Sequence, residues 1–210
     1  MRFQLFGRAV AGLVICTMAA ANAQQENFPE AGSGKIFPTQ VTFSFEGKDY
    51  TLLATGAAQA KREKKTGDAV ATHTIAHYME AAKPDSAESI FEIILQRPIA
   101  KQVIIDFDRA SSLEKIQKGY KLFFSKVIAP TELAEMKAAV EEFTGAFTKD
   151  VEAGQRMMIR WLPDGRLVVI MPEAPEKIVS ASALGALLWK SWFGESTRVD
   201  RFSLVERFPK

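Results

Sequence analysis

Apolar and polar residues alternate in two stretches of the first half of the chain, which is the pattern of a strand with one buried face. The first stretch covers residues 41–45, and a turn at 46–48 connects it to a second apolar arm over residues 50–54. Alternation returns over residues 69–79, after a charged stretch and a turn signal at Gly67. Arms and turns of this kind predict antiparallel strands.

The middle of the chain changes to helical spacing. Ser86 is expected to cap a short helix, and Ser111 with Glu114 forms a capping box before a longer helix that Pro130 ends. Thr131 is expected to cap the next helix, in which apolar residues recur at intervals of three and four. These apolar residues are Leu133, Met136, Val140, Phe143 and Phe147.

Strands return around this helical middle. The β-rich run 101–107 predicts a strand, and residues 155–162 and 166–171 flank a Pro-Asp-Gly turn as the clearest hairpin in the sequence. The apolar run 182–193 predicts a last helix that Gly194 ends in a left-handed conformation, followed by a final short strand or tail. Hairpins on both sides of a helical middle indicate an α+β fold, in which an antiparallel β-sheet carries a layer of helices on one face.

The N-terminus has the three parts of a secretory signal peptide, residues 1–23. Arg2 and Arg8 supply a basic start, residues 9–21 are mostly apolar, and Ala-Asn-Ala at 21–23 offers the small-x-small pattern of a cleavage site. The alternative is a buried N-terminal helix. We expect cleavage, and therefore a protein that is periplasmic or secreted.

Cleavage after Ala23 changes the composition of the remaining chain. Residues 24–40 are polar and are expected to form a flexible leader, and residues 41–210 are expected to form one domain. Removal of the two N-terminal arginines leaves 25 basic residues against 25 acidic ones, so no basic surplus remains for nucleic acid. Cys16, the only cysteine, would be lost, which excludes a disulfide or a thiolate nucleophile. No later apolar stretch reaches the roughly 18 residues of a membrane helix, so the mature protein is expected to be soluble.

His73 and His77 are the only histidines. On a strand they share a face about 13 Å apart, at roughly 3.3 Å per residue, which is too far for one metal ion. On a helix the spacing could bind a metal, but the glutamate of an HExxH motif is absent. The pattern predicts one buried, hydrogen-bonded imidazole and one histidine at a rim, with no metal and no cofactor.

Two further groups of charged residues are candidates for chemistry. Asp106 and Asp108 at the end of a predicted strand could form a carboxylate pair for acid–base catalysis, although solvated charge is the usual explanation. A run of five charged residues begins at Lys61 and is typical of a solvated face. The functional alternative is that Lys61 or Arg62 points into an apolar pocket and binds an anion through charge-assisted hydrogen bonds.

Several segments together carry a family resemblance. They are, in order, residues 47–57, 74–80, 143–147, 162–166 and 186–195. In this order they resemble the chalcone isomerase family over about residues 41–205, and within it the bacterial branch whose members carry signal peptides. The resemblance implies the chalcone isomerase-like open-faced β-sandwich.

The resemblance also implies which residues would line the site. In the family's enzymes an arginine on the first long strand polarises the substrate, and hydroxyl residues, a tyrosine and an asparagine complete the cleft. The arginine's place falls near Lys61 or Arg62, the threonine's place holds His73, and a late hydroxyl position holds Ser191. Tyr120 is the only phenol near the tyrosine's place and is not equivalent. Lys61, Arg62, His73 and Ser191 are therefore the candidate ligand-binding or catalytic residues.

Because the full catalytic set is missing, the resemblance favours a non-catalytic protein that binds an amphipathic small molecule such as a fatty acid in a cleft between sheet and helices. One alternative is an isomerase of the intramolecular lyase type, acting on an enone-like substrate with His73 handling the proton. Another is a structural or interaction protein of the cell envelope. Exposed Trp189 or Trp192 would favour the last alternative, whereas buried positions would make them core residues.

Overall fold

The structure, a computed structural model, describes residues 26–63, 67–83, 89–180, 182–195 and 197–208. The predicted signal peptide and the predicted cap Ser86 lie outside the described residues.

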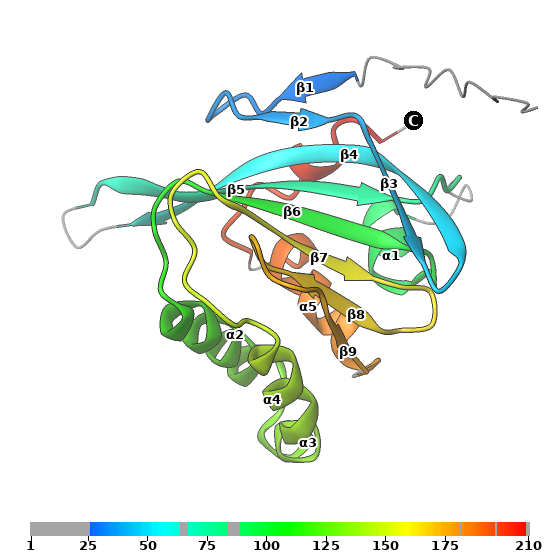
Figure 1. The fold of residues 1–210 in the computed structure, drawn as a ribbon. Coiled ribbons are helices and arrows are strands. Elements are labelled where there is room, and N and C mark those ends of the chain that lie inside the picture. Colours follow the sequence, from blue (N-terminus) through cyan, green and yellow to red (C-terminus); the bar gives the residue numbers. More distant parts are fainter. Residues whose placement is uncertain (1–25, 64–66, 84–88, 181, 196, 209–210) are drawn as a thin grey trace, which may run out of the picture.

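Seven antiparallel strands form one sheet, in which each strand pairs with its neighbours in the sequence. Figure 1 shows that the sheet curls strongly at the turn that joins β3 to β4. The strands are β3 (Gln40–Phe45), β4 (Lys48–Glu63), β5 (Ala69–Met79), β6 (Lys101–Phe107), β7 (Arg156–Trp161), β8 (Leu167–Ile170) and β9 (Lys177–Val179). β5 and β6 have the bounds that the sequence predicts, and β4 is longer than predicted, with 16 residues.

The α-helices lie on one face of this sheet (Figure 1), so the prediction of an α+β fold with one helical layer is confirmed. They are α1 (Ile90–Gln96), α2 (Leu113–Val127), α3 (Pro130–Glu135), α4 (Lys137–Gly145) and α5 (Leu184–Phe193), followed by the 3₁₀ helix η1 (Ser203–Val205). Within the described ranges, none of these helices combines the length and the apolar character that crossing a bilayer requires.

Two helices begin at other serines than the sequence predicts. Ser112 caps α2, because Ser111 is used in a backbone bridge with Val151. Ser89 caps α1 in a capping box with Glu92, in which each side chain accepts a hydrogen bond from the backbone N–H of the other.

The helix predicted after Pro130 is divided into α3 and α4 at Met136, where ψ is 3°. Pro130 occupies the first turn of α3, where its missing N–H costs no helical hydrogen bond. Ala129 is the capping residue, so the prediction that Thr131 caps this helix is wrong.

The end of α5 also differs from the prediction. Gly194 follows the helix with φ −69°, which is not a left-handed conformation. A Cβ atom at Gly194 would lie 2.6 Å from the Lys190 carbonyl oxygen, so close approach rather than positive φ favours glycine here. Of the short strand or tail expected next, the described residues after α5 form a tail that contains the 3₁₀ helix η1 and no strand.

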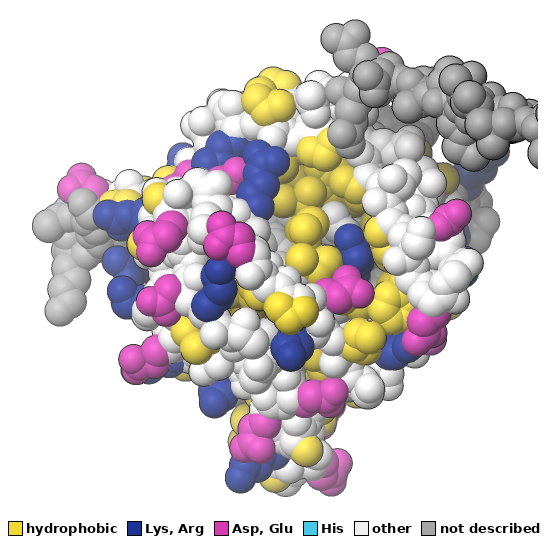
Figure 2. Space-filling view, in the orientation of Figure 1, with side chains coloured by type: hydrophobic (Ala, Val, Ile, Leu, Met, Phe, Trp, Pro, Cys, Tyr) yellow, Lys and Arg dark blue, Asp and Glu magenta, His cyan; other side chains and the backbone are white. Residues whose placement is uncertain are grey.

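Residues 26–40 are more ordered than their polar composition predicts, and the expectation of a flexible leader is wrong for this part. β1 (Asn27–Pro29) and β2 (Ile36–Pro38) form a small antiparallel sheet over the sheet face that lacks α-helices (Figure 1). Phe28 and Phe37 are buried there and anchor it. On the same face, hydrophobic side chains also gather at the surface (Figure 2).

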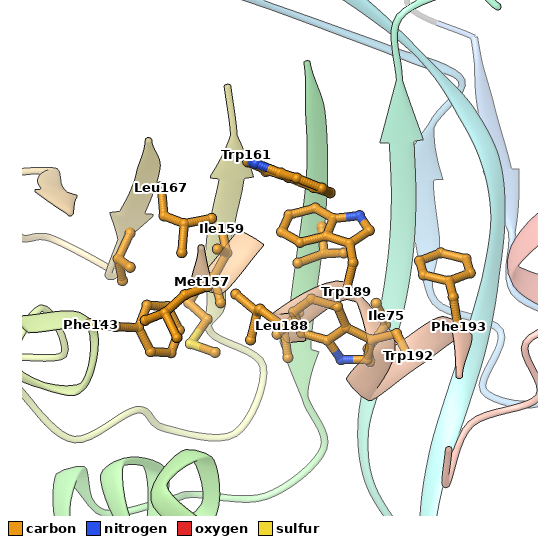
Figure 3. Packing of buried hydrophobic residues seen from close by; sticks show 14 of the residues in the cluster. Ile75, Phe143, Met157, Ile159, Trp161, Leu167, Leu188, Trp189, Trp192 and Phe193 are labelled. Atoms are coloured by element: carbon orange, nitrogen blue, oxygen red, sulfur yellow. The ribbon is translucent and has the colours of Figure 1, made fainter. Parts of the chain in front are cut away.

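The core between the sheet and the helices is rich in aromatic residues. Trp189 of α5 is fully buried, with its ring centre 5.4 Å from the rings of both Trp161 and Trp192 (Figure 3). Trp192 is 5 % exposed. Both tryptophans of α5 are therefore core residues, as expected for a strongly apolar helix.

Candidate binding site between the sheet and the helices

A cavity of about 840 Å³ opens between the ends of β4 to β6, helix α2 and the region around the end of α5; we call it the sheet–helix cavity. Its volume is in the range of roughly 300–1,000 Å³ that is typical of small-molecule sites. Most of its wall is apolar. The larger apolar side chains are Phe91, Leu95, Ile105, Phe107, Ile116, Leu122, Phe123, Val127, Met157, Trp192, Phe193 and Val199.

All four residues that the sequence singled out line this cavity: Lys61, Arg62, His73 and Ser191. Lys61 and Arg62 come from the end of β4, His73 from β5 and Ser191 from α5. Lys61 and Arg62 are both exposed, so they lie at the rim. The hypothesis of a cation enclosed in the apolar interior is therefore not met by either residue.

The charged residues of the wall are nevertheless mostly basic. Seven described lining residues are basic, and Glu195 is the one acidic residue among them. The seven, which we call the cavity cations, are Lys61, Arg62, Lys115, Lys126, Lys190, Arg198 and Arg201. Among the described residues, the Arg201 guanidinium donates to the Phe193 carbonyl, and the charged side-chain groups of the other six have no ion pair or hydrogen bond with a protein group. Their charge is available to an anion.

Sequence reasoning missed five of the cavity cations. Lys115 and Lys126 on α2 are eleven residues apart, which is about three helical turns, so they fall on one face of the helix. Leu122 and Val127 also line the cavity and are 53 % and 40 % exposed. Lysines that share a helical face with exposed apolar residues were a signal in the sequence. Arg198 and Arg201 follow α5 and had no periodic signal.

A fully buried cation does exist, but outside the cavity. The ammonium group of Lys101 lies 4.1 Å from the centre of the Trp161 ring and donates to the carbonyl oxygen of Ile99. Burial lowers the pKa of Lys101 to about 7. Because Lys101 does not line the sheet–helix cavity, it supplies no charge to a ligand there.

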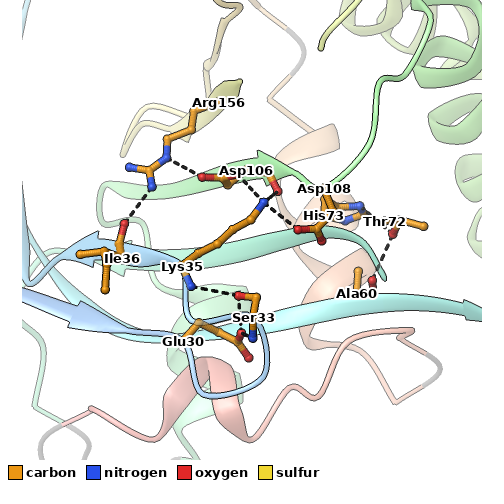
Figure 4. Close-up of polar contacts among 10 residues, drawn as sticks. All are labelled: Glu30, Ser33, Lys35, Ile36, Ala60, Thr72, His73, Asp106, Asp108 and Arg156. Carbon is orange, nitrogen blue, oxygen red and sulfur yellow. Dashed lines mark hydrogen bonds and ion pairs between the residues drawn. The ribbon is translucent and has the colours of Figure 1, made fainter. Parts of the chain in front are cut away.

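His73 is positioned by an irregularity in the sheet. Ala60 of β4 pairs with His73, and Lys61 pairs with Ala71, so Thr72 is an extra residue in a β-bulge. The Thr72 hydroxyl lies 3.1 Å from the Ala60 carbonyl oxygen and 3.1 Å from Nδ1 of His73 (Figure 4). Burial lowers the pKa of His73 to about 4, so its ring is neutral near pH 7.

His77 is the buried, hydrogen-bonded histidine that the sequence predicts. Its Nε2 accepts a hydrogen bond from the Trp189 indole N–H at 3.1 Å, and its Nδ1 lies 2.7 Å from the Thr55 hydroxyl. That hydroxyl donates to the Leu204 carbonyl oxygen at 2.7 Å. Burial lowers the pKa of His77 well below its ordinary value. The described residues contain no group of acidic, histidine or cysteine side chains that could hold a metal ion.

Asp106 and Asp108 are not the solvated charges that the sequence suggested. Asp106 is 5 % exposed and forms ion pairs with Lys35 and Arg156, and Lys35 also lies 2.8 Å from Asp108 (Figure 4). Neither aspartate lines the sheet–helix cavity. The two carboxylates hold the N-terminal segment to the sheet, and they do not form an acid–base pair facing a ligand.

Ser191 and Tyr120 are two of the hydroxyl residues in the wall. The Ser191 hydroxyl oxygen is buried and has no hydrogen-bond partner among the described residues. The ring of Tyr120 stacks on Phe147 at 5.0 Å, and burial raises the pKa of its phenol. Both remain protonated near neutral pH, so they can donate or accept hydrogen bonds but carry no charge.

Comparisons with known proteins agree with this architecture. A search of curated proteins found no match. A crystal structure of the Arabidopsis thaliana fatty-acid binding protein AtFAP1 is similar with a TM-score of 0.71 and 13 % identity, covering 87 % of this chain and 95 % of that one. At this identity the likeness shows the fold alone. The family model described as chalcone isomerase-like matches residues 33–201. The chain belongs to the chalcone isomerase-like family.

Proposed function

We propose that this chain binds an amphipathic anionic small molecule of the fatty-acid class in the sheet–helix cavity, and that it does not act as an isomerase. The observation that carries the proposal is the composition of the cavity wall, which is apolar and has seven basic residues against one acidic residue among those described. An apolar chain would fill the interior, and the acid group would face the cavity cations.

The two parts of such a ligand would be held by different forces. Burial of apolar surface contributes roughly 25 cal/mol per Å², so the hydrocarbon chain would supply most of the affinity. The exposed cations would add a smaller contribution that salt weakens, because charges in contact with solvent are screened. The fold shared with AtFAP1, which is named as a fatty-acid binding protein, supports the proposal at the level of architecture.

The absence of catalysis is part of the proposal. Both cations nearest the family's arginine position, Lys61 and Arg62, are exposed. An exposed cation stabilises the charge that develops on a ketone less than one in a dry pocket. His73 stands at the place of the family's threonine, and no tyrosine matches the family's position.

Charge-matched variants on one helix test the binding proposal. Lys115→Gln/Lys126→Gln removes two cavity cations, and Lys118→Gln/Lys121→Gln removes two lysines of α2 that do not line the cavity. We expect the first variant to weaken binding of a fluorescent fatty acid about threefold to tenfold at low salt. The control variant is expected to bind within twofold of the unmodified protein.

Native mass spectrometry of the purified protein provides the independent measurement. Co-purified acyl chains, or complexes with added octadecanoic acid, are the expected result. Failure to form any complex with long-chain acids, alcohols or phenols would contradict the proposal, and so would equal losses of affinity in the two double variants.

An intramolecular lyase is the second candidate function. It is favoured by the neutral imidazole of His73 and the hydroxyls of Ser191 and Tyr120, which line the same cavity. The decisive measurement is chalcone turnover by absorbance, with His73→Ala as the comparison. Under our proposal neither protein has turnover, whereas turnover that is lost in His73→Ala would establish the lyase.

We also propose that the chain is exported, to the periplasm or out of the cell. The support is the signal-like sequence of residues 1–23, which lies outside the described residues. N-terminal sequencing of the protein recovered from the periplasm of a Gram-negative host is expected to begin at Gln24. Recovery of the uncleaved chain from the cytoplasm alone would contradict export.

A further inference from the structure

The hydrogen atoms around His73 can be assigned from the geometry of its neighbours. The Thr72 hydroxyl has a single hydrogen, and the Ala60 carbonyl oxygen, 3.1 Å away, can only accept it. Nδ1 of His73 must therefore donate to the hydroxyl oxygen of Thr72. In this tautomer Nε2 carries a lone pair and no hydrogen, so it is a hydrogen-bond acceptor.

The same assignment holds at His77. The Thr55 hydroxyl donates to the Leu204 carbonyl oxygen, so Nδ1 of His77 donates to Thr55 and Nε2 is an acceptor. There the indole N–H of Trp189 supplies the donor at 3.1 Å. A buried acceptor without a donor destabilises the fold, and in this network every acceptor has a donor.

At His73 the corresponding donor is missing from the protein. His73 lines the sheet–helix cavity, and no described residue donates a hydrogen bond to its Nε2. The charged groups that influence the ring are Asp108 and Lys35. A carboxylate placed against Nε2 would bring two acceptors together, so this nitrogen favours a ligand group that carries a hydrogen.

We propose that Nε2 of His73 accepts a hydrogen bond from a hydroxyl group on the ligand, so that the preferred ligand is a hydroxylated fatty acid. The carboxylate faces the cavity cations, and the hydroxyl lies deeper, against His73. The inference rests on the proposed function, because it names the chemical class that the same cavity selects. The unpartnered Ser191 hydroxyl is a second polar atom in this wall for such a ligand.

Nitrogen NMR of the unmodified protein tests the inference directly, because the chain has two histidines. Long-range ¹⁵N–¹H spectra are expected to show unprotonated Nε2 in both rings. On addition of a hydroxylated octadecanoic acid, the Nε2 signal of His73 is expected to shift in the direction of hydrogen bonding, while that of His77 stays in place. A bound ligand that leaves the His73 signal unchanged at every hydroxyl position tried would overturn the inference.

Affinities give the second readout. A set of octadecanoic acids with a hydroxyl at different positions is compared with the methyl ether of each and with octadecanoic acid itself. One hydroxylated acid is expected to bind about threefold to tenfold more tightly than its ether, which corresponds to one neutral hydrogen bond. His73→Phe removes the acceptor and is expected to abolish this preference, and His73→Gln, which retains an acceptor oxygen, to restore part of it.

The results separate the inference from the proposed function. If no long-chain acid binds, the proposed function itself fails. If the hydroxylated acids and their methyl ethers bind equally, or if the preference for the hydroxyl persists in His73→Phe, the cavity binds fatty acids and only the proposed role of His73 is wrong.

Discussion

Two threonines interrupt the pairing of β4 and β5, one in each strand, and each lies beside one of the two histidines. Thr55 is the extra residue of β4, between Ala54 and Gly56, and Thr72 is the extra residue of β5. Both hydroxyls donate to a backbone carbonyl and accept from Nδ1 of a histidine. The local arrangement is therefore the same at both bulges.

The surroundings of the two bulges differ. At Thr55, η1 packs against β4. The Leu204 carbonyl comes from η1, and the indole of Trp189 comes from α5. At Thr72 the ring of His73 lies 6.1 Å from the ring of Phe107 and lines the sheet–helix cavity, and no described residue donates a hydrogen bond to its Nε2. The same pairing of a bulge threonine with a histidine thus has two outcomes. Where a distant segment supplies a donor to Nε2, the hydrogen-bond network is complete, and where none does, Nε2 is left to bind a ligand.

Acidification should have the largest effect, because it acts on both histidines. Burial lowers the pKa of His73 to about 4 and that of His77 well below its ordinary value, whereas both are near 6.5 in the unfolded chain. Between pH 6.5 and 4 the unfolded chain binds protons that the folded chain does not, so the stabilisation is complete above pH 6.5 and decreases as the pH falls.

Urea denaturation at pH 7.5 and pH 5 measures this loss. We expect the free energy of unfolding to fall by about 2 kcal/mol from the protonation of His73 alone, and by a further amount from His77, whose pKa is lowered in the same direction. His73→Phe should retain only the part due to His77. A free energy of unfolding that stays constant over this range, or a variant as pH-sensitive as the unmodified protein, would mean that the rings are not held neutral.

Gly56→Ala should disrupt the hydrogen-bond network of Thr55 and His77. A Cβ atom at Gly56 would lie 2.1 Å from the backbone oxygen of Ser203, so η1 must move away and Thr55 loses its carbonyl acceptor. We expect a destabilisation of about 3 kcal/mol by urea denaturation. Gly119→Ala, on the cavity side of α2, is the matched control, because its Cβ meets nothing within 4 Å. It is expected to be neutral or about 1 kcal/mol more stable; equal effects at both glycines would refute the distinction.

Trp189→Phe removes the donor that closes the His77 network. The substitution leaves Nε2 buried without a partner and reduces the packed volume, for an expected loss of about 2–3 kcal/mol. Trp192→Phe, on the same helix, removes a similar volume but no hydrogen bond to a histidine. Chemical denaturation of both variants isolates the hydrogen bond, and a difference below about 0.5 kcal/mol would show that it contributes little.

Replacement of each threonine by valine should have the smallest effects. Thr55→Val leaves the buried Nδ1–H of His77 and the Leu204 carbonyl without partners and is expected to cost about 1–2 kcal/mol. Thr72→Val, where the residue is only half-buried, is expected to cost less than about 1 kcal/mol, because water can replace the hydroxyl. Thermal denaturation of the two variants side by side would contradict the comparison if the order were reversed.

Strong periodic patterns made the central strands predictable. β5 and β6 have the expected bounds because alternation and a continuous β-rich run are local properties. The start of α2 was misplaced by one residue, since two adjacent serines could cap it and pairing of Ser111 with Val151 decides between them. The hairpin of β1 and β2 was missed because each three-residue strand buries a single aromatic, Phe28 or Phe37, which is too short for a period to be visible.

The candidate site was only partly predictable. Family resemblance led to Lys61, Arg62, His73 and Ser191, which come together at one cavity. The resemblance did not predict how exposed these four side chains are, and it missed the other five cavity cations. The bulge at Thr72 was not predictable either, because a bulge is defined by the register of two strands and not by the residues of one.

By itself, the sequence determined the fold class, the family and the presence of two histidines on one face of a strand, because alternation, helical spacing and segment order are properties of the chain. Only the tertiary structure decided that Trp189 and the Leu204 carbonyl complete the network at His77 while His73 is left facing a cavity. The physical reason is that a hydrogen-bond partner 112 or 149 residues away is set by packing and leaves no local pattern in the sequence.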